Sequence, residues 1–399
     1  METSGVKKFI LRTLSYLLVA VLASTMTLFF FYRQGTGKLS QLSMVIENQF
    51  IGEADTEAME DAAAAAMVDA IGDRWSYYMT AQEYEDAQHR KNNTYVGIGI
   101  TVSAREDEKG IDILKVEQGS SAETAGIQAG DILIAAAGQD VTGLDINAAG
   151  DLIRGEPGTE VEISVLRGEE TLNFTVRRQV IDMAVAVGTM LPGNVGLVTI
   201  ENFNSKCAAE STAAIEELLE QGATALIFDV RNNPGGYLSE LIKLLDYLLP
   251  EGVLLKTVDY SGGEEIDRSD ADCLEVPMAV LINGNSYSAA EFFAAALQEY
   301  DWAVLVGENT TGKGYYQQTI QLIDGSAVNL STGKYFTPNG VSLTEVGGLK
   351  PEVLVKVDEE MALRIYAGIL PPEEDPQVQA AIKVLTESVS TVGGADRED

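Results

Sequence analysis

Hydrophobic positions follow three different patterns along the chain, and each pattern predicts a different kind of structure. Near the N-terminus, Thr13–Tyr32 is a run of 20 residues without a formal charge. From Tyr95 to about residue 180, apolar and polar residues alternate in short stretches between glycine and acidic turns, which predicts a small β-rich domain. From about Ile181, continuous apolar strands alternate with amphipathic helices, and this predicts an α/β sheet covered on both faces.

The same patterns predict the individual elements. In the β-rich segment we expect two helices, 121–125 and 147–154, and strands over 96–102, 111–116, 131–136, 161–166 and 171–177. In the α/β segment we expect helices over 207–221, 237–249 and 288–300 and strands over 195–200, 225–229, 278–282 and 303–306. Flanking helices are expected over 58–71, 81–91 and 377–388, the last of them before a polar tail.

The uncharged run near the N-terminus predicts a membrane anchor over residues 9–32. At about 1.5 Å per residue the run spans about 30 Å, the thickness of a bilayer core. The positive-inside rule places residues 1–8 in the cytoplasm, because three basic side chains precede the run, Lys7, Lys8 and Arg12. A cleaved signal peptide, with Val21 and Ala23 near the processing site, is the competing interpretation, but the apolar run continues past Ala23.

Composition excludes several classes of function. Lys and Arg number 27 against 61 Asp and Glu, a formal net charge of −34, so the chain lacks the basic surface that nucleic-acid binding requires. The single histidine, His89, excludes a multi-histidine zinc site and leaves a Ser-His-Asp triad dependent on that one residue. Two cysteines, Cys207 and Cys273, allow one disulfide or two free thiols.

Two segments join a buried strand to a helix through a turn that offers chemistry. Asp229–Gly236 ends in a glycine turn, which can direct backbone N–H groups at an anion or serve as an ordinary connection. In Asn283–Glu291, Ser288 with Glu291 three residues later forms a capping-box pattern, an ordinary structural motif. The alternative function of Ser288 is a nucleophile at the positive end of a helix.

A third segment, Gly307–Gly314, resembles a phosphate-binding loop but does not satisfy its requirements. Gly314 occupies the position of the magnesium-binding Ser or Thr, and Tyr315–Ile323 alternates like a strand where a helix is needed. Lys313 is then either a solvated turn lysine or, in an apolar site, a base at neutral pH. Gln317, four residues later, points to the same face if the segment is a strand. With no suitable histidine, a serine nucleophile requires another base, and lysine is a known substitute.

Two motifs in the β-rich segment resemble a PDZ domain. They are Tyr95-Val96-Gly97-Ile98-Gly99-Ile100 and Ala125-Gly126-Ile127-Gln128-Ala129-Gly130-Asp131-Ile132-Leu133. The resemblance implies that residues 95–100 border a groove in which N–H groups of the Gly97–Gly99 turn hold the C-terminal carboxylate of a peptide. Glycines that only form a tight turn are the plainer interpretation.

The α/β segment resembles the carboxyl-terminal processing peptidases, also called tail-specific proteases. The resemblance rests on Ala279–Asn283, Ser286–Glu291, Ala296–Gln298, Val306–Glu308, Gly312–Gly314 and Gln317, and extends over roughly residues 40–370. It implies Ser288 as nucleophile, Lys313 as general base and Gln317 as the residue that positions the lysine. It also implies an oxyanion hole from the N–H groups of Ala289 and one glycine of the 235–236 pair, Gly236 rather than Gly235. Tyr287 departs from the family pattern, in which alanine is usual.

The predicted fold is an α/β protease core, a sheet covered by helices, with an inserted PDZ domain and an N-terminal transmembrane helix. The expected divisions are residues 1–8 (cytoplasmic tail), 9–32 (anchor), 33–93 (helical region), 94–180 (PDZ domain), 181–370 (Ser-Lys protease core) and 371–399 (C-terminal helix and polar tail).

The predicted function is a membrane-anchored serine endopeptidase acting on protein or peptide substrates with free C-termini. Its catalytic domain is expected on the extracytoplasmic side of the cell membrane, without a metal or other cofactor, and as a homodimer if it follows its relatives. An inactive, membrane-tethered PDZ adaptor is the alternative.

Overall fold

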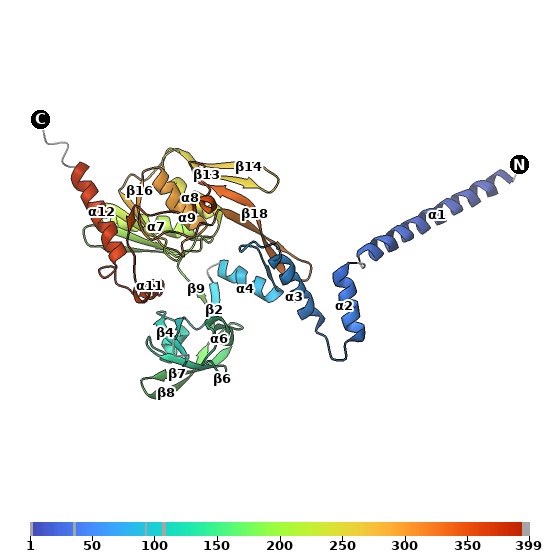
Figure 1. Ribbon diagram of the computed structural model, residues 1–399, viewed down its shortest axis with the longest axis horizontal. Helices are drawn as coiled ribbons and strands as arrows, with labels where there is room; N and C mark the ends of the chain where they lie inside the picture. The colour runs from blue at the N-terminus through green and yellow to red at the C-terminus, as the bar shows by residue number, and fades with distance from the viewer. Residues whose placement is uncertain (1–2, 35–36, 92–93, 106–108, 393–399) are drawn as a thin grey trace. The chain divides into compact units, whose positions relative to one another are not determined.

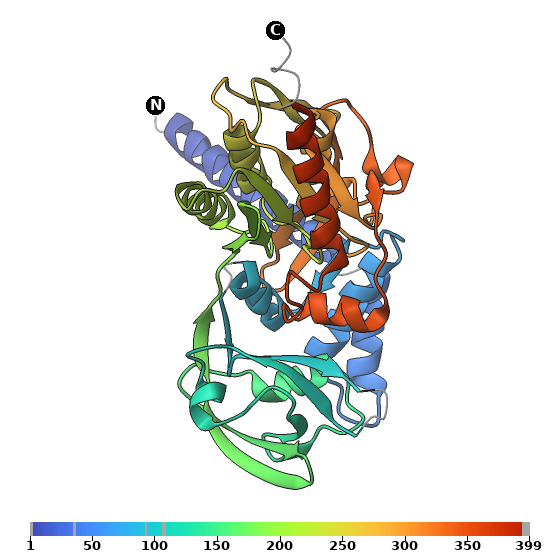
Figure 2. The same cartoon turned by 90° about the vertical axis from the view of Figure 1, so that its left-hand side faces the viewer.

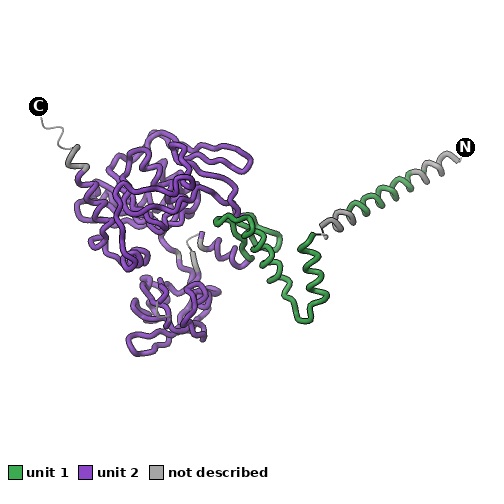
Figure 3. Tube along the Cα trace, viewed as in Figure 1, with its two compact units in different colours: residues 1–80, 320–329 green, residues 81–319, 330–399 purple. Residues whose placement is uncertain are grey.

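The structure is a computed structural model that describes residues 3–34, 37–91, 94–105 and 109–392. The polar tail predicted after the C-terminal helix lies outside the described residues from position 393 onward. The chain divides into two units, residues 1–80 with 320–329, and residues 81–319 with 330–399 (Figure 3). The second unit contains both the β-rich and the α/β segments.

Helices make up most of the first unit. They are α1 (Thr3–Gln34), α2 (Lys38–Gln49) and α3 (Thr56–Asp69), followed by the short strand β1 (Tyr77–Met79). The Asp55 carboxylate accepts a hydrogen bond from Ala58 N–H at 3.0 Å and so caps the start of α3. β1 pairs antiparallel with residues 327–329, which explains why this distant segment belongs to the same unit.

The predicted transmembrane helix over residues 9–32 is wrong. In the part of the chain that the structure describes, no helix combines the length and the apolar character needed to cross a bilayer. The prediction counted formal charges, whereas residues 12–27 of α1 include five Ser and Thr side chains. Thr25 and Thr27, for example, donate to the carbonyl groups of Leu22 and Ala23. An uncharged run is not the same as an apolar run. The extracytoplasmic location of the catalytic domain stays a prediction.

The β-rich segment folds around its own core. Its main sheet has the order β3-β4-β5-β7-β8, with β6 paired to β5, and consists of β3 (Ile100–Ala104), β4 (Ile111–Val116), β5 (Ile132–Ala136), β6 (Gln139–Asp140), β7 (Glu160–Arg167) and β8 (Glu170–Arg177). Helices α5 (Ser121–Ala125) and α6 (Ile146–Ile153) pack on this sheet. A separate antiparallel pair, β2 (Thr94–Gly97) with β9 (Gln179–Asp182), joins the two ends of the segment (Figure 1).

The α/β segment contains a six-stranded sheet with the order β10-β11-β12-β15-β16-β19. These strands are β10 (Ala186–Leu191), β11 (Val195–Ile200), β12 (Ala225–Asp229), β15 (Met278–Ile282), β16 (Ala303–Gly307) and β19 (Val353–Leu354). Only β10 runs antiparallel to its neighbour. Helices α7 (Cys207–Glu220), α8 (Leu238–Leu248), α9 (Ala289–Glu299) and α12 (Pro376–Val392) cover it (Figures 1 and 2).

Alternating side chains of the central strand β12 show how both faces are buried. Leu226 and Phe228 point into a core formed with α7, α8 and α9, whereas Ala225 and Ile227 point into a core formed with α12. All four side chains are at most 3% exposed, which accounts for the continuous apolar run that predicted this strand. The predicted two-faced burial is confirmed, and α12 alone among the described helices contributes to the second core.

A second sheet was not predicted, although the alternation over Tyr315–Ile323 indicated one of its strands. It has the order β1-β18-β13-β14 with β17 paired to β18, and its remaining strands are β13 (Gly252–Asp259), β14 (Glu264–Ser269), β17 (Tyr315–Gln321) and β18 (Ala327–Phe336). Two short helices were also not predicted, α10 (Leu343–Val346) and α11 (Glu359–Tyr366). The predicted helix at 81–91 is α4 (Ala81–Lys91).

Both cysteines are free thiols, which settles the alternative that composition left open. Cys207 is fully buried at the start of α7, with its sulfur 3.9 Å from the Ser211 hydroxyl. Burial raises the pKa of Cys207 to about 12, so this thiol is protonated at neutral pH and packs as a small apolar side chain.

An internal ion pair makes the stability of the β-rich domain dependent on pH. Asp131 is 1% exposed and accepts hydrogen bonds from Arg167 Nε at 2.6 Å and from Gln128 N–H at 2.9 Å. Burial opposes the charged carboxylate, but the hydrogen bonds and charge of Arg167 bring the pKa of Asp131 below its ordinary value. This stabilisation is therefore present above the unfolded pKa, about 3.9, and is lost as pH falls through the lower folded value.

We expect Asp131→Asn to lower the unfolding transition of the β-rich domain by about 4–8 °C at pH 7, the shift that about 1 kcal/mol produces in a domain of this size. The difference between variant and wild type should shrink as pH falls below about 3.9. Calorimetry at several pH values measures both, with Asp140→Asn as an exposed control. A difference that stays constant with pH would contradict the assignment.

Candidate active site

The turn that carries Ser288 lies between the end of β15 and the start of α9. Ser288 has φ 59° and ψ −126°, a conformation that costs a residue with a Cβ about 1–3 kcal/mol and persists only where neighbours impose it. Neighbouring loops hold the turn from two sides: Tyr287 N–H donates to the Asn233 carbonyl at 3.1 Å, and Thr311 N–H donates to the Ser286 carbonyl at 3.2 Å. The side chain is therefore presented by a rigid, strained turn.

A buried carboxylate joins this turn to the loop that carries the lysine. Glu291 is fully buried, and its Oε2 accepts from Ser288 N–H at 3.0 Å and from Lys313 N–H at 2.8 Å. Its Oε1 accepts from Gly312 N–H at 2.7 Å and from the Thr310 hydroxyl. The predicted contact between Glu291 and the Ser288 backbone is present, but the glutamate holds two segments in place and does more than end a helix.

The glycine turn after β12 lies against the serine. A Cβ on Gly235 would lie 2.8 Å from Ser288 Cβ and 2.8 Å from Ala289 N, so only glycine allows the two turns to approach this closely. Gly235 also has φ +86°, a conformation that favours glycine. Gly236 packs on the other side, where a Cβ would lie 2.3 Å from the Phe203 carbonyl oxygen. Sequence reasoning proposed these glycines but could not establish their contact with Ser288.

The backbone N–H groups of Gly236 and Ala289, the predicted oxyanion donors, have no hydrogen-bond partner among the described residues. The N–H of Gly235, by contrast, donates to Asn233 Oδ1 at 2.8 Å. Asn233 is fully buried and also donates to the Ile200 carbonyl at 2.7 Å, so its side chain fixes the glycine turn. The role of Gly236 and Ala289 as oxyanion donors stays a prediction.

Lys313 lies in the loop before β17, not within the strand, since that strand begins at Tyr315. Its Nζ is 5.6 Å from the centroid of the Tyr287 ring, within the range of a cation–π contact. Gln317 Nε2 donates to the Tyr315 carbonyl and to Ser331 Oγ, both at 3.1 Å. The carboxamide is thus held in place, with Oε1 left as the atom that can accept a hydrogen bond.

A cavity of about 600 Å³ adjoins the glycine turn and includes Gly236 and Gln317 in its lining. Aromatic side chains from several elements contribute to the same wall, among them Tyr237, Tyr316 and Tyr335. A cavity of this size has room for several residues of an extended chain.

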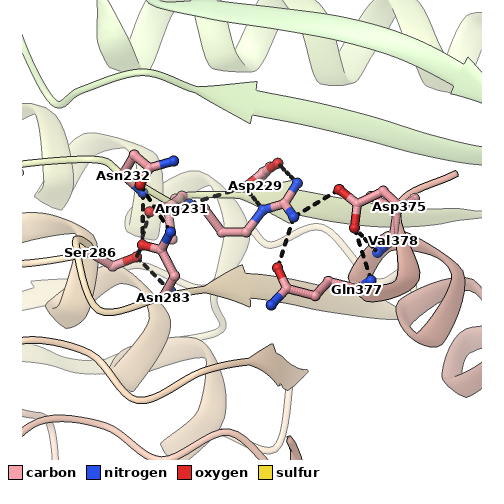
Figure 4. Close-up of polar contacts among 9 residues, drawn as sticks. Asp229, Arg231, Asn232, Asn283, Ser286, Asp375, Gln377 and Val378 are labelled. Atoms are coloured by element: carbon pink, nitrogen blue, oxygen red, sulfur yellow. Dashed lines mark hydrogen bonds and ion pairs between the residues drawn. The ribbon is translucent and has the colours of Figure 1, made fainter. Parts of the chain in front are cut away.

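Arg231 lies at the centre of a buried polar network that sequence reasoning missed (Figure 4). Its Nε donates to Asp229 Oδ1 at 2.9 Å, and its Nη1 contacts Asp375 Oδ2 and Gln377 Oε1, each at 2.8 Å. The arginine side chain is 5% exposed. Burial opposes its charge, but the carboxylates of Asp229 and Asp375 raise the pKa of Arg231 further above its ordinary value.

The residue after Arg231 connects the two turns. Asn232, which has φ 59°, donates through its N–H to Asn283 Oδ1 at 2.9 Å and accepts at Oδ1 from Asn283 Nδ2 at 3.0 Å (Figure 4). Ser286 Oγ donates to the Val230 carbonyl at 2.7 Å. Ser286 is therefore committed to structure, which separates it from Ser288 as a candidate nucleophile.

The residues proposed to bind a peptide C-terminus divide among three environments. Tyr95, Val96 and Gly97 belong to β2 and pair with β9, while Ile98 is 1% exposed in the core of the β-rich segment. Gly99 and Ile100 lie where β3 begins. The predicted strand over 96–102 is broken here because Gly99 has φ +83° and a Cβ on it would lie 2.4 Å from Ser120 Cβ. Helix α6 packs near β3, so a strand and a helix border this part of the domain.

Comparison with known proteins agrees with this geometry. The family model for peptidase family S41 matches residues 194–355, and that for the PDZ domain matches residues 113–167. A carboxy-terminal processing protease, CtpA, from Bacillus subtilis is 31% identical over 359 residues, covering 86% of this chain and 76% of the relative. The chain belongs to peptidase family S41. It is a serine peptidase of the carboxyl-terminal processing class with a PDZ domain.

Further relatives of this S41 peptidase support the assignment. A carboxyl-terminal-processing protease from Synechocystis is 31% identical over 331 residues, covering 81% of this chain and 76% of the relative. Among solved structures, a photosystem II D1 C-terminal processing protease aligns with a TM-score of 0.50 and 26% identity, covering 81% of this chain and 88% of that protein.

Gly235→Ala tests the contact between the two turns. The added Cβ would meet Ser288 and displace the adjacent N–H groups, so kcat should fall about 100- to 1,000-fold, the usual cost of losing an oxyanion donor. Gly193→Ala is a matched control, because Gly193 has a similar φ of +82° and open space around its Cβ position. Equal activity of the two variants in a peptide-cleavage assay would contradict the contact.

Glu291→Gln tests the shared carboxylate. One oxygen becomes an NH₂ group facing two donors, and each buried group left unpaired costs about 1–3 kcal/mol. We expect kcat to fall at least about 10-fold and the melting temperature to fall as well. Glu299→Gln is the control, since Glu299 at the other end of α9 also accepts two hydrogen bonds, from Thr337 Oγ1 and Asn339 N–H. A drop in kcat of the same size in that control would argue against a specific role.

Proposed function

We propose that this S41 peptidase is an endopeptidase in which Ser288 is the nucleophile and Lys313 the general base. One observation supports this assignment above the others: the backbone N–H groups of both residues donate to the same oxygen of Glu291, at 3.0 and 2.8 Å. The strained turn and the lysine loop are thereby held to one buried group. The only histidine of the sequence, His89, lies on α4 and outside these turns.

The chemistry proceeds in two stages. Ser288 Oγ attacks the carbonyl carbon of the scissile peptide bond while the neutral amine of Lys313 accepts the serine proton. The N–H groups of Gly236 and Ala289 donate to the oxygen that becomes negative in the tetrahedral intermediate. Lys313 then returns the proton to the leaving amine. In the second stage it activates water, which attacks the acyl-enzyme and releases Ser288.

Gln317 positions the lysine in this mechanism. Its Nε2 donates to Ser331 and to the Tyr315 carbonyl, so the orientation of the carboxamide is fixed. Oε1 then accepts a hydrogen bond from the lysine amine, which directs the nitrogen lone pair toward the serine.

The PDZ domain selects the substrate by its C-terminal end. PDZ domains take an extended peptide beside a strand and hold its carboxylate with backbone N–H groups, and the start of β3 next to α6 offers such a border. The Bacillus subtilis and Synechocystis relatives are named for carboxy-terminal processing. Substrates are therefore proteins or peptides whose free C-terminus reaches the PDZ domain.

Lys313→Ala and Ser288→Ala test the proposal. Both variants should lose at least about 1,000-fold in kcat on an unfolded protein, because nucleophile and base act as a unit. Binding of a C-terminal peptide should stay unchanged, since neither residue belongs to the PDZ domain. Mass spectrometry of the fragments reports cleavage, and Lys350→Ala, an exposed lysine, is the control.

Full activity of Lys313→Ala would reject the lysine base. A wild-type chain that binds C-terminal peptides yet leaves no fragments that Ser288→Ala abolishes would support the inactive adaptor instead.

A further inference from the structure

Two residues at the start of the C-terminal helix α12 contact Arg231, which lies beside the candidate active site. Asp375 Oδ2 and Gln377 Oε1 each lie 2.8 Å from Arg231 Nη1, and Figure 4 shows both side chains directed at the guanidinium. Their side chains are almost completely buried: Asp375 is 2% and Gln377 1% exposed. The Arg231 side chain has three partner residues among the described residues: Asp229 at the end of β12, and Asp375 and Gln377 at the start of α12.

Because Arg231 is buried and charged, the stability of its contact with Asp375 and Gln377 depends strongly on geometry. A buried guanidinium is stable only when its donors are paired and its charge is balanced. The Asp375 carboxylate has a second task, since its Oδ1 accepts from Gln377 N–H at 2.9 Å and Val378 N–H at 3.2 Å and so caps α12. The Asp375 side chain therefore holds both the start of α12 and the guanidinium of Arg231.

Arg231 immediately precedes the turn that forms the oxyanion hole. Its own N–H donates to Asp229 Oδ1 at 3.0 Å, so the side-chain network also holds the backbone at the end of β12. Asn232 and Asn233 follow: Asn232 Oδ1 accepts hydrogen bonds from Asn283 and Asn285 in the Ser288 turn, and Asn233 Oδ1 accepts from Gly235 N–H. A displacement of Arg231 would therefore also displace the glycine turn at residues 235–236, whose N–H groups are proposed to face the scissile carbonyl.

We propose that Asp375 and Gln377 are positioning residues for catalysis. By holding Arg231, the start of α12 keeps the turn that contains Gly235 and Gly236 in its position beside Ser288. The inference rests on the proposed function of Ser288 and the 235–236 turn. The packing of α12 supports it: Val378, Ala381 and Leu385 are buried against β11, β12, β15 and β16, so the helix provides a fixed anchor for the polar contact. Neither Asp375 nor Gln377 contacts the reacting atoms.

Asp375→Asn separates the two tasks of the aspartate. Asparagine is as good a helix cap as aspartate, so the start of α12 is retained. It has only one acceptor oxygen, however, and an NH₂ group then faces either the helix or Arg231. We expect kcat to fall about 10-fold or more, the value of a hydrogen bond to a charged group, while KM and the pH midpoint of activity stay unchanged.

The control is the neighbouring residue. Glu374→Gln removes an ion pair to Arg364 of 2.9 Å whose side chains are 36% and 55% exposed, and it should leave kcat within about 2-fold. Gln377→Met provides a second route, because it removes the other contact to Arg231 without touching the aspartate. All assays are run with the full chain at a temperature where circular dichroism shows each variant folded.

A double-mutant cycle decides between positioning and general destabilisation. If Asp375 acts through Arg231, Arg231→Lys combined with Asp375→Asn should lose no more activity than Arg231→Lys alone. Additive losses, or an Asp375→Asn variant with the kcat of Glu374→Gln, would overturn the inference. Cleavage that depends on Ser288 is established separately with wild type and Ser288→Ala, so failure of this inference would leave the proposed function intact.

Discussion

The carboxylate of Glu291 is the interaction on which the geometry of the site depends. It accepts hydrogen bonds from two segments that are distant in sequence, the turn at Ser288 and the loop at Lys313. Because a carboxylate only accepts, its two oxygens satisfy backbone N–H groups that would otherwise be buried without partners. The strain at Ser288, with φ 59°, is tolerated because this contact and the close packing of Gly235 leave the turn no relaxed alternative.

The fold around the site follows from a parallel sheet with both faces covered. At the carboxyl end of β12 and of β15 the chain leaves the sheet in adjacent turns, the usual place for a site in such a sheet. The two turns meet through Asn232 and Asn283: the Asn283 side chain accepts from the Asn232 backbone N–H and donates to the Asn232 side-chain oxygen. The ends of these two strands therefore bring the Ser288 turn and the glycine turn together, and Glu291 at the start of α9 holds the Ser288 turn from the other side.

Much of the core could be predicted because local patterns determine it. The strands at 111–116, 195–200, 225–229 and 278–282 have the predicted bounds, since each is a short apolar run between turn residues. The contact between Arg231 and Gln377 could not be predicted, because the two residues are 146 positions apart and no local pattern relates them. The anchor prediction failed for a different reason: absence of charge was read as apolar character, although hydroxyl side chains are spread through α1.

The pairing of β2 with β9 has a consequence for how this peptidase can change. Thr94 is opposite Asp182 and Gly97 is opposite Gln179, so the PDZ domain enters and leaves the chain at neighbouring points. A domain inserted in this way can be exchanged without altering the order or spacing of the strands on either side. The domain proposed to select the substrate and the turns of the candidate site are thus separable pieces of sequence, and recombination at one ribbon can exchange the first while the second stay as they are.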